Sequence, residues 1–200
     1  AARGEPPCQP VEIGARWTRK CAVIEVRAAT RDDLAQLAEL MREHLLYQQQ
    51  VSNNYFQLAP QVDWPRYIEG LLGSATTGLL VAALDSRLLG FAHLQVLRPA
   101  LRPVPRGLRG LLYRLLRRRR PGPTPVFQPR SMGVVQGVYV RPDARDGRAA
   151  RGLFRASTEW FKERGVTEME GLVWAANEAV LKLARWAGFE VISLRVRKTL

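Results

Sequence analysis

The sequence predicts one α/β domain of the α+β kind, with a mixed, mostly antiparallel sheet and helices on both faces. Two patterns carry this prediction. Apolar runs at 79–84 and 88–96, separated by a three-residue polar turn, indicate an antiparallel hairpin. Between 132 and 174 a strand, an amphipathic helix and a second strand follow one another, which is typical of a parallel β-α-β unit.

Composition supports a single core. The 200 residues are 46% hydrophobic, enough for one well-filled domain. No run of about 18 apolar residues occurs and no basic-then-apolar leader is present, so we expect a cytoplasmic protein. Cys8 and Cys21 fit no metal-binding spacing, and no metal is expected.

Residues 1–20 are rich in Pro, Gly and Arg, and we expect them to form a flexible extension before the domain. The single domain is expected to span 21–200. Its first strand is predicted at 21–27. Thr30 to Asp33 supply a helix start, and leucines at helical spacing continue that helix to about Gln48. A second helix is predicted at Trp64–Leu72, before Gly73.

The second half holds the remaining elements. A strand is predicted at 132–140, and the helix from Gly147 to about Arg164 ends at Gly165. The last three elements are expected in the order strand, helix, strand, at 168–174, 177–186 and 189–198. The element order is therefore β-α-α-β-β-β-α-β-α-β, with an insertion before the fourth strand.

The insertion, at 98–130, carries most of the net charge. Residues 96–130 hold ten arginines and no acid, so ten of the net +13 charges lie there and +3 remain elsewhere. Leucines at helical spacing predict a basic amphipathic helix at 107–120. It could pack on the domain, on a second subunit of a homodimer, on an anionic membrane or on nucleic acid. Binding of nucleic acid usually needs several aromatic residues for base stacking, and the helix at 107–120 has only Tyr113. We therefore expect this helix to pack on the domain, and nucleic acid and membrane are not the expected partners.

The segment from Val138 to Phe154 holds the clearest chemical signal. A strand ends at Pro142-Asp143, a basic loop containing Gly147 follows, and a helix begins. The first N–H groups of a helix have no acceptor within it and bind anions. The segment therefore predicts a phosphate-binding site.

The residue order in this segment resembles the acetyl-CoA pyrophosphate loop of GNAT-type N-acetyltransferases. That signature is Gln/Arg-x-x-Gly-x-Gly/Ala after a strand with Tyr-Val-x-Pro, and Arg145 and Ala150 occupy its first and last positions. Arg148 stands where the family has glycine. A second family pattern matches at Val173-x-x-x-Asn177, followed at the expected distances by Leu183, Gly188 and Phe189. The predicted element order is also similar to the GNAT fold.

The resemblance implies that acetyl-CoA is the co-substrate and assigns its binding residues. The family splays the strand that holds Tyr139, which would leave main-chain groups of Val138 and Val140 for the pantetheine amides. Asn177 caps a helix and would lie near the pantetheine arm. The pyrophosphate would be held by the loop and helix start, at Arg145, Asp146, Gly147, Arg148, Ala149, Ala150 and Arg151.

The usual proton-transfer positions of the family are not filled. The family places an acid on the strand before the loop, where this chain has Gln136 and Gly137. It places a tyrosine on the later helix, predicted here at 177–186, where this chain has Ala184. The catalytic candidates are instead His93, Tyr139 and Glu170, each of which could also be a packing or surface residue.

The end of the first helix offers acceptor-binding candidates. In the family this region shapes the acceptor pocket, which implicates Glu43, His44 and Tyr47, and Glu43 could attract a cationic amine. The expected function is N-acetyl transfer to a primary amine of a small molecule or protein in a ternary complex. A non-catalytic acyl-CoA sensor and a nucleic-acid or membrane-surface adaptor acting through 107–120 remain alternatives.

Overall fold

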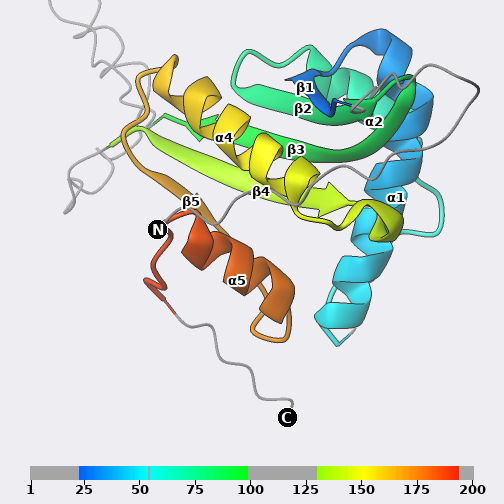
Figure 1. Cartoon of the computed structure of the whole chain (residues 1–200). Coiled ribbons are helices and arrows are strands. Elements are labelled where there is room, and N and C mark those ends of the chain that lie inside the picture. The colour runs from blue at the N-terminus through cyan, green and yellow to red at the C-terminus, as the bar shows by residue number, and fades with distance from the viewer. Residues whose placement is uncertain (1–22, 54, 99–129, 194–200) are drawn as a thin grey trace, which may run out of the picture.

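A computed structural model describes residues 23–53, 55–98 and 130–193 (Figure 1). The predicted N-terminal extension and the predicted helix at 107–120 lie outside these residues.

The core of the molecule is a sheet with the strand order β1-β2-β3-β4-β5 (Figure 1). Neighbouring strands from β1 to β4 are antiparallel, and β5 is parallel to β4. The predicted mixed, mostly antiparallel sheet is confirmed. The strand bounds are β1 Glu25–Ala28, β2 Thr77–Leu84, β3 Arg87–Leu97, β4 Met132–Val140 and β5 Met169–Gly171.

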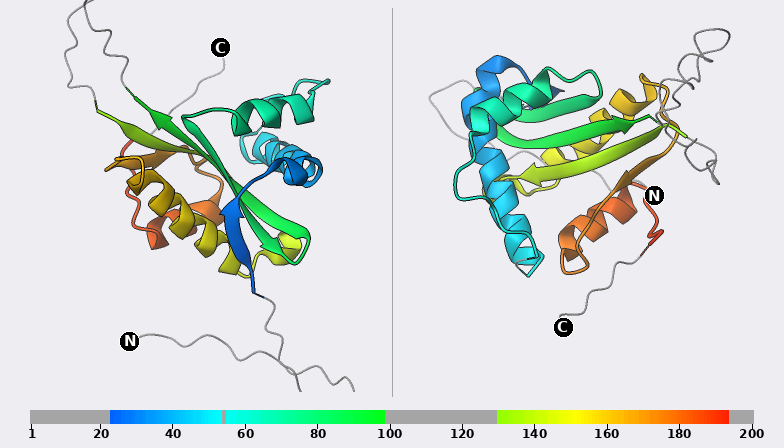
Figure 2. Two further views of the ribbon diagram at one scale, coloured as in Figure 1. Left: turned by 90° about the horizontal axis from the view of Figure 1, so that it is seen from above. Right: turned by 180° about the vertical axis from the view of Figure 1, so that it is seen from behind.

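Helices cover both faces of the sheet, as predicted. A short 3-10 turn at Arg31–Asp33 leads into α1, Leu34–Val51, which lies with α2, Trp64–Leu72, on one face. The other face is covered by α4, Arg148–Lys162, as the view from above shows (Figure 2). The final helix, α5, covers Glu178–Trp186 and follows β5.

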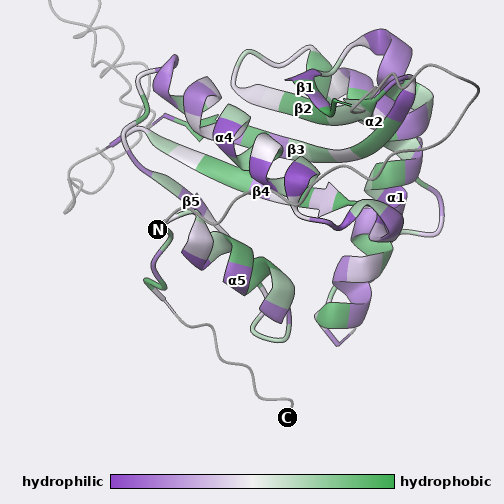
Figure 3. Ribbon diagram, in the orientation of Figure 1, coloured by the Kyte–Doolittle hydropathy of each residue, from purple (hydrophilic) through white to green (hydrophobic). Residues whose placement is uncertain are grey.

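Period-two alternation along the strands builds a core on each face of the sheet. In β2, Leu79 and Val81 pack with the α1 residues Leu37 and Leu40, whereas Leu80 and its alternate neighbours pack with α4. The strands are largely hydrophobic and the helices alternate in hydropathy along their lengths (Figure 3). The sheet is therefore buried between two helical layers.

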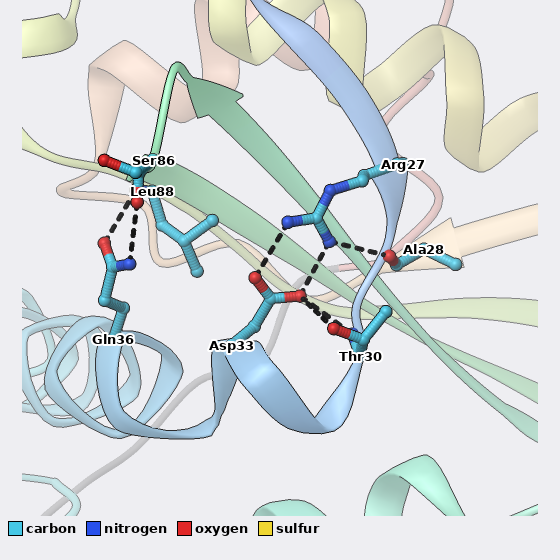
Figure 4. A network of polar contacts seen from close by, with 7 residues as sticks. All are labelled: Arg27, Ala28, Thr30, Asp33, Gln36, Ser86 and Leu88. Carbon is cyan, nitrogen blue, oxygen red and sulfur yellow. Dashed lines mark hydrogen bonds and ion pairs between the residues drawn. The ribbon is translucent and has the colours of Figure 1, made fainter.

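Polar contacts fix the start of α1 against the sheet (Figure 4). The guanidinium of Arg27 donates two hydrogen bonds to the buried carboxylate of Asp33, at 2.7 and 2.9 Å, and the Thr30 N–H donates a third at 2.8 Å. The pKa of Asp33 is lowered, chiefly by the hydrogen bond from Arg27.

One α1 side chain also forms hydrogen bonds with the β2–β3 turn. The amide of Gln36 accepts from the Leu88 N–H at 2.8 Å and donates to the Ser86 carbonyl at 2.9 Å (Figure 4). These two hydrogen bonds fix the position of α1 relative to the hairpin.

The predicted strands at the ends of the domain are too long. The first strand begins at Glu25, not Cys21, and exposed Val23 lies before it. The strand expected at 168–174 is limited to Met169–Gly171, because its pairing with β4 ends there. Of the strand expected at 189–198, residues 189–193 are irregular and largely exposed, and 194–198 lie outside the described residues.

None of the helices in the described part of the chain has both the length and the apolar character needed to cross a bilayer.

Candidate functional site

The C-terminal half of β4 has a free edge among the described strands. Pairing between β4 and β5 covers Gly133 to Val135 and then ends, whereas β4 stays paired with β3 up to Val140. The next residue, Arg141, donates its N–H to the Leu89 carbonyl of β3 at 2.8 Å. Because main-chain groups alternate in direction along a strand, those of Val138 and Val140 point away from β3, toward the side that β5 has left.

The loop after β4 leads into the first turn of α4. Gly147 has a φ of +85°, a conformation that L side chains rarely adopt, and a Cβ added there would lie 2.7 Å from Nη1 of Arg151. The N–H groups of Ala149 and Ala150 follow in the first turn, where no acceptor exists within the helix. A small residue and free donors therefore meet at one helix start, which suits a bound anion.

Asp146 and Arg148 pair with each other on the surface of this loop. The Arg148 N–H and Nε donate to the Asp146 carboxylate at 2.8 and 2.7 Å. The pKa of Asp146 is lowered, chiefly by the backbone hydrogen bond from Arg148. The arginine that replaces the family's glycine is thus held at the side of the loop.

Arg145 turns toward the sheet. Its Nε donates to the Val140 carbonyl at 3.0 Å, one of the main-chain groups on the free edge. Its guanidinium carbon lies 5.4 Å from the ring centroid of Tyr47 and 5.6 Å from that of Tyr139. Arg145 therefore joins the free edge of β4, where we predict cofactor binding, to Tyr47 of α1. We call the α1 residues predicted to bind the acceptor, Glu43, His44 and Tyr47, the acceptor wall.

Helix α1 forms that wall. Tyr139 donates its hydroxyl to Glu43 at 3.2 Å, and the pKa of Tyr139 is raised by burial and by this carboxylate. Arg141 also binds Glu43, at 3.2 Å. Tyr47 donates its hydroxyl to Oδ1 of Asn177 at 3.3 Å, and the same oxygen caps α5. Residues predicted separately for cofactor and acceptor binding are therefore in contact.

The two histidines of the chain, His44 of α1 and His93 of β3, both lie next to Gly137 of β4. His93 is the register partner of Gly137, and a Cβ added to Gly137 would lie 2.8 Å from Nε2 of His44. His44 is buried, and burial lowers its pKa to about 4. Burial also lowers the pKa of His93.

A β-bulge at Gln136 lies beside the histidines. The register of β3 and β4 shifts between His93 and Leu94, which leaves Gln136 as the extra residue of β4. Its side-chain amide donates to Oε1 of the Gln95 side chain at 2.6 Å. The third catalytic candidate, Glu170 of β5, is paired with Val134 of β4, at the opposite end of β4 from Tyr139.

Two residues of this region were missed by sequence reasoning. Gln95 could have been found, because it follows His93 by two residues and shares its face of the strand. Arg141 carried only a weak signal, a basic residue directly after a strand, and its two carboxylate partners come from α1.

The open β4 edge and the adjoining helix start fit an extended ligand with an anionic end. The sequence matches the model of the acetyltransferase (GNAT) family over residues 37–189, and the chain belongs to this family. The prediction of acetyl-CoA as co-substrate is thereby confirmed. No curated protein matches the chain in sequence.

Solved structures share the fold at low identity. The tetramutant of the BH1408 protein from Bacillus halodurans has a TM-score of 0.67 and 16% identity, and covers 88% of this chain and 99% of its own. An aminoglycoside N-acetyltransferase in complex with CoA has a TM-score of 0.62 and 16% identity over 92% and 98%. An aminoglycoside antibiotic 6'-N-acetyltransferase from Acinetobacter haemolyticus has a TM-score of 0.60 and 15% identity over 88% and 97%.

Proposed function

We propose that the protein transfers an acetyl group from acetyl-CoA directly to a primary amine of a small molecule or protein, in a ternary complex. Family membership supports the acetyl transfer. The rest is supported by Arg145, which contacts Val140 on the free β4 edge and the rings of Tyr47 and Tyr139. A co-substrate bound along that edge would therefore lie beside an acceptor bound at α1.

The chain's own groups fit the extended co-substrate. Main-chain groups of Val138 and Val140 would pair with its amides, and the N–H groups of Ala149 and Ala150 would hold its phosphates. Arg145 must release the Val140 carbonyl for this pairing, which frees its guanidinium to bind phosphate. When bound, acetyl-CoA supplies the activated acetyl group.

The remaining predicted residues have distinct roles in this proposal. Asn177 would contact the co-substrate and Tyr47 would contact the acceptor, and a hydrogen bond joins the two side chains. Tyr139 stays protonated at neutral pH, because its pKa is raised, and can donate a hydrogen bond. His93 can accept a proton at neutral pH, since burial favours its neutral form.

Titration calorimetry with acetyl-CoA tests the binding, and release of CoA thiol across a panel of amines tests the transfer. We expect binding in the micromolar range and turnover with some of the amines. Absence of binding at several hundred micromolar would contradict the proposal. Binding without turnover on any amine would favour the acyl-CoA sensor.

A further inference from the structure

The first two turns of α4 carry positive charge at the end of the helix where the helix dipole disfavours it. Residues 148–155 include Arg148, Arg151 and Arg155 and no acid. Acidic side chains are favoured at a helix start and basic ones at a helix end. Arg151 and Arg155 are also four residues apart, a spacing at which like charges repel each other. A local arrangement that opposes helix stability in this way is expected at a functional site.

The arginines lie on the side of α4 that is turned away from the sheet. The buried residues of the helix, which include Leu153 and Ser157, form the opposite side. Arg155 is exposed and Arg151 is partly exposed, so both can reach a ligand bound outside the core. We call Arg151 and Arg155 the α4 arginine pair.

The acids of this region pair with other basic side chains. Asp146 accepts from the Nε of Arg148 at 2.7 Å, and Glu159 accepts from Lys162 at 2.9 Å. Among the residues that the structure describes, none forms an ion pair or a side-chain hydrogen bond with the α4 arginine pair. The two guanidinium charges are therefore uncompensated within the described part of the protein.

The α4 arginine pair begins at the loop that we assign to the pyrophosphate. A Cβ added to Gly147 would lie 2.7 Å from Nη1 of Arg151, so this guanidinium lies against the loop. Four residues of helix, about 6 Å along the axis, separate Arg151 from Arg155. The pair therefore extends from the phosphate loop to a point about one turn beyond it.

Acetyl-CoA has a second anionic group at a matching distance. Its ribose bears the pyrophosphate on the 5′ oxygen and a phosphate monoester on the 3′ oxygen. One sugar ring separates the two groups, a length comparable with one helical turn of about 5.4 Å. A phosphate monoester has a charge of about −2 at neutral pH, and a guanidinium can bind two phosphate oxygens at once.

We propose that the α4 arginine pair binds the 3′-phosphate of acetyl-CoA, so that the protein prefers CoA to 3′-dephospho-CoA. This inference rests on the acetyl-CoA binding in the proposed function, but not on the acceptor or on the transfer step. Arg145 and the N–H groups of Ala149 and Ala150 remain for the pyrophosphate.

Titration calorimetry with CoA and with 3′-dephospho-CoA tests the proposal, because the two ligands differ in this one phosphate. We expect the native protein to bind CoA about tenfold more tightly, since charged hydrogen bonds are made only by that ligand. Arg155→Gln should reduce the preference to about twofold by weakening CoA binding alone. Equal affinities of the native protein for the two ligands would overturn the proposal. So would a preference that neither Arg155→Gln nor Arg151→Gln reduces.

Two further variants separate specific binding from general charge. Arg164→Gln removes an equal charge beyond the other end of α4, where the guanidinium lies over the ring of Trp160, and should keep the full preference. Arg155→Lys keeps the charge but loses the paired hydrogen bonds, and should keep part of the preference. If Arg164→Gln reduces the preference as much as Arg155→Gln does, net charge accounts for it and the proposal is contradicted.

The same titrations distinguish this inference from the proposed function. If the native protein binds both ligands with equal affinity, the co-substrate site stands and the role of the α4 arginine pair is refuted. If it binds neither ligand, the proposed function fails and this inference fails with it.

Discussion

The buried charge of Asp33 attaches the start of α1 to Arg27 of β1. Its carboxylate is buried and accepts from Arg27 and Thr30 (Figure 4). We expect Asp33→Asn to lower the free energy of unfolding by about 2 kcal/mol at pH 7, because charged hydrogen bonds are lost and Arg27, which is partly exposed, is left unpaired. Urea unfolding measures this change.

The pH dependence of this effect has a defined sign. Because the folded-state pKa of Asp33 is lowered, its contribution to stability is present above the unfolded value of about 3.9 and is lost as the pH falls through the folded pKa. The difference between the native chain and Asp33→Asn should therefore shrink at acidic pH. Asp32→Asn, at the exposed neighbouring position, is the control and should show little effect. A constant difference across pH would contradict this account.

Single residues also show where sequence reasoning reached and where it stopped. The role of Asn177 as a helix cap was readable, because an asparagine before an amphipathic run supplies the capping oxygen. Its contact with Tyr47 was not readable, because that residue lies 130 positions away in the chain and meets it only through the fold. The convergence of His44 and His93 on Gly137 was hidden for the same reason.

At the scale of elements, the start of α4 depends on the left-handed conformation of Gly147. We expect Gly147→Ala to cost about 1 kcal/mol of stability and to weaken acetyl-CoA binding about tenfold, because the new Cβ would displace Arg151 and distort the loop. Calorimetry gives the affinity and thermal unfolding gives the stability.

Gly188 provides a matched control for this substitution. Its φ of +86° is nearly that of Gly147, but a Cβ there would meet nothing within 4 Å. Gly188→Ala should lose similar stability and retain affinity for acetyl-CoA. Equal affinities in the two variants would argue against the α4 start as the phosphate site.

Elements with strong periodicity were predicted closely, and elements defined by a partner were not. β4 and α2 have the predicted bounds, because alternation and caps are encoded within them. β5 is shorter than its apolar run, because its length is set by where β4 diverges. The divergence itself followed from the family resemblance, not from the local sequence.

At the scale of the whole molecule, the insertion emerges from a hairpin that could close without it. Leu97 at the end of β3 is paired with Met132 at the start of β4. Replacing residues 99–130 by Asn-Gly would leave the four residues Arg98-Asn-Gly-Ser131 between this pair, with Asn-Gly at the centre of the turn. The replacement removes nine arginines and no acid, so the net charge falls from +13 to +4.

We expect the shortened protein to fold and to bind acetyl-CoA within about twofold of the native affinity, since the sheet, α1 and α4 are unchanged. The exposed ion pair between Arg130 and Glu168 would be lost at little cost. Heparin chromatography should show elution at lower salt, because binding to polyanions follows the removed charge. A full-length variant with Arg117 to Arg120 replaced by glutamine separates charge from length. If the shortened protein folds but no longer binds acetyl-CoA, the insertion is part of the co-substrate site and the domain described above is incomplete without it.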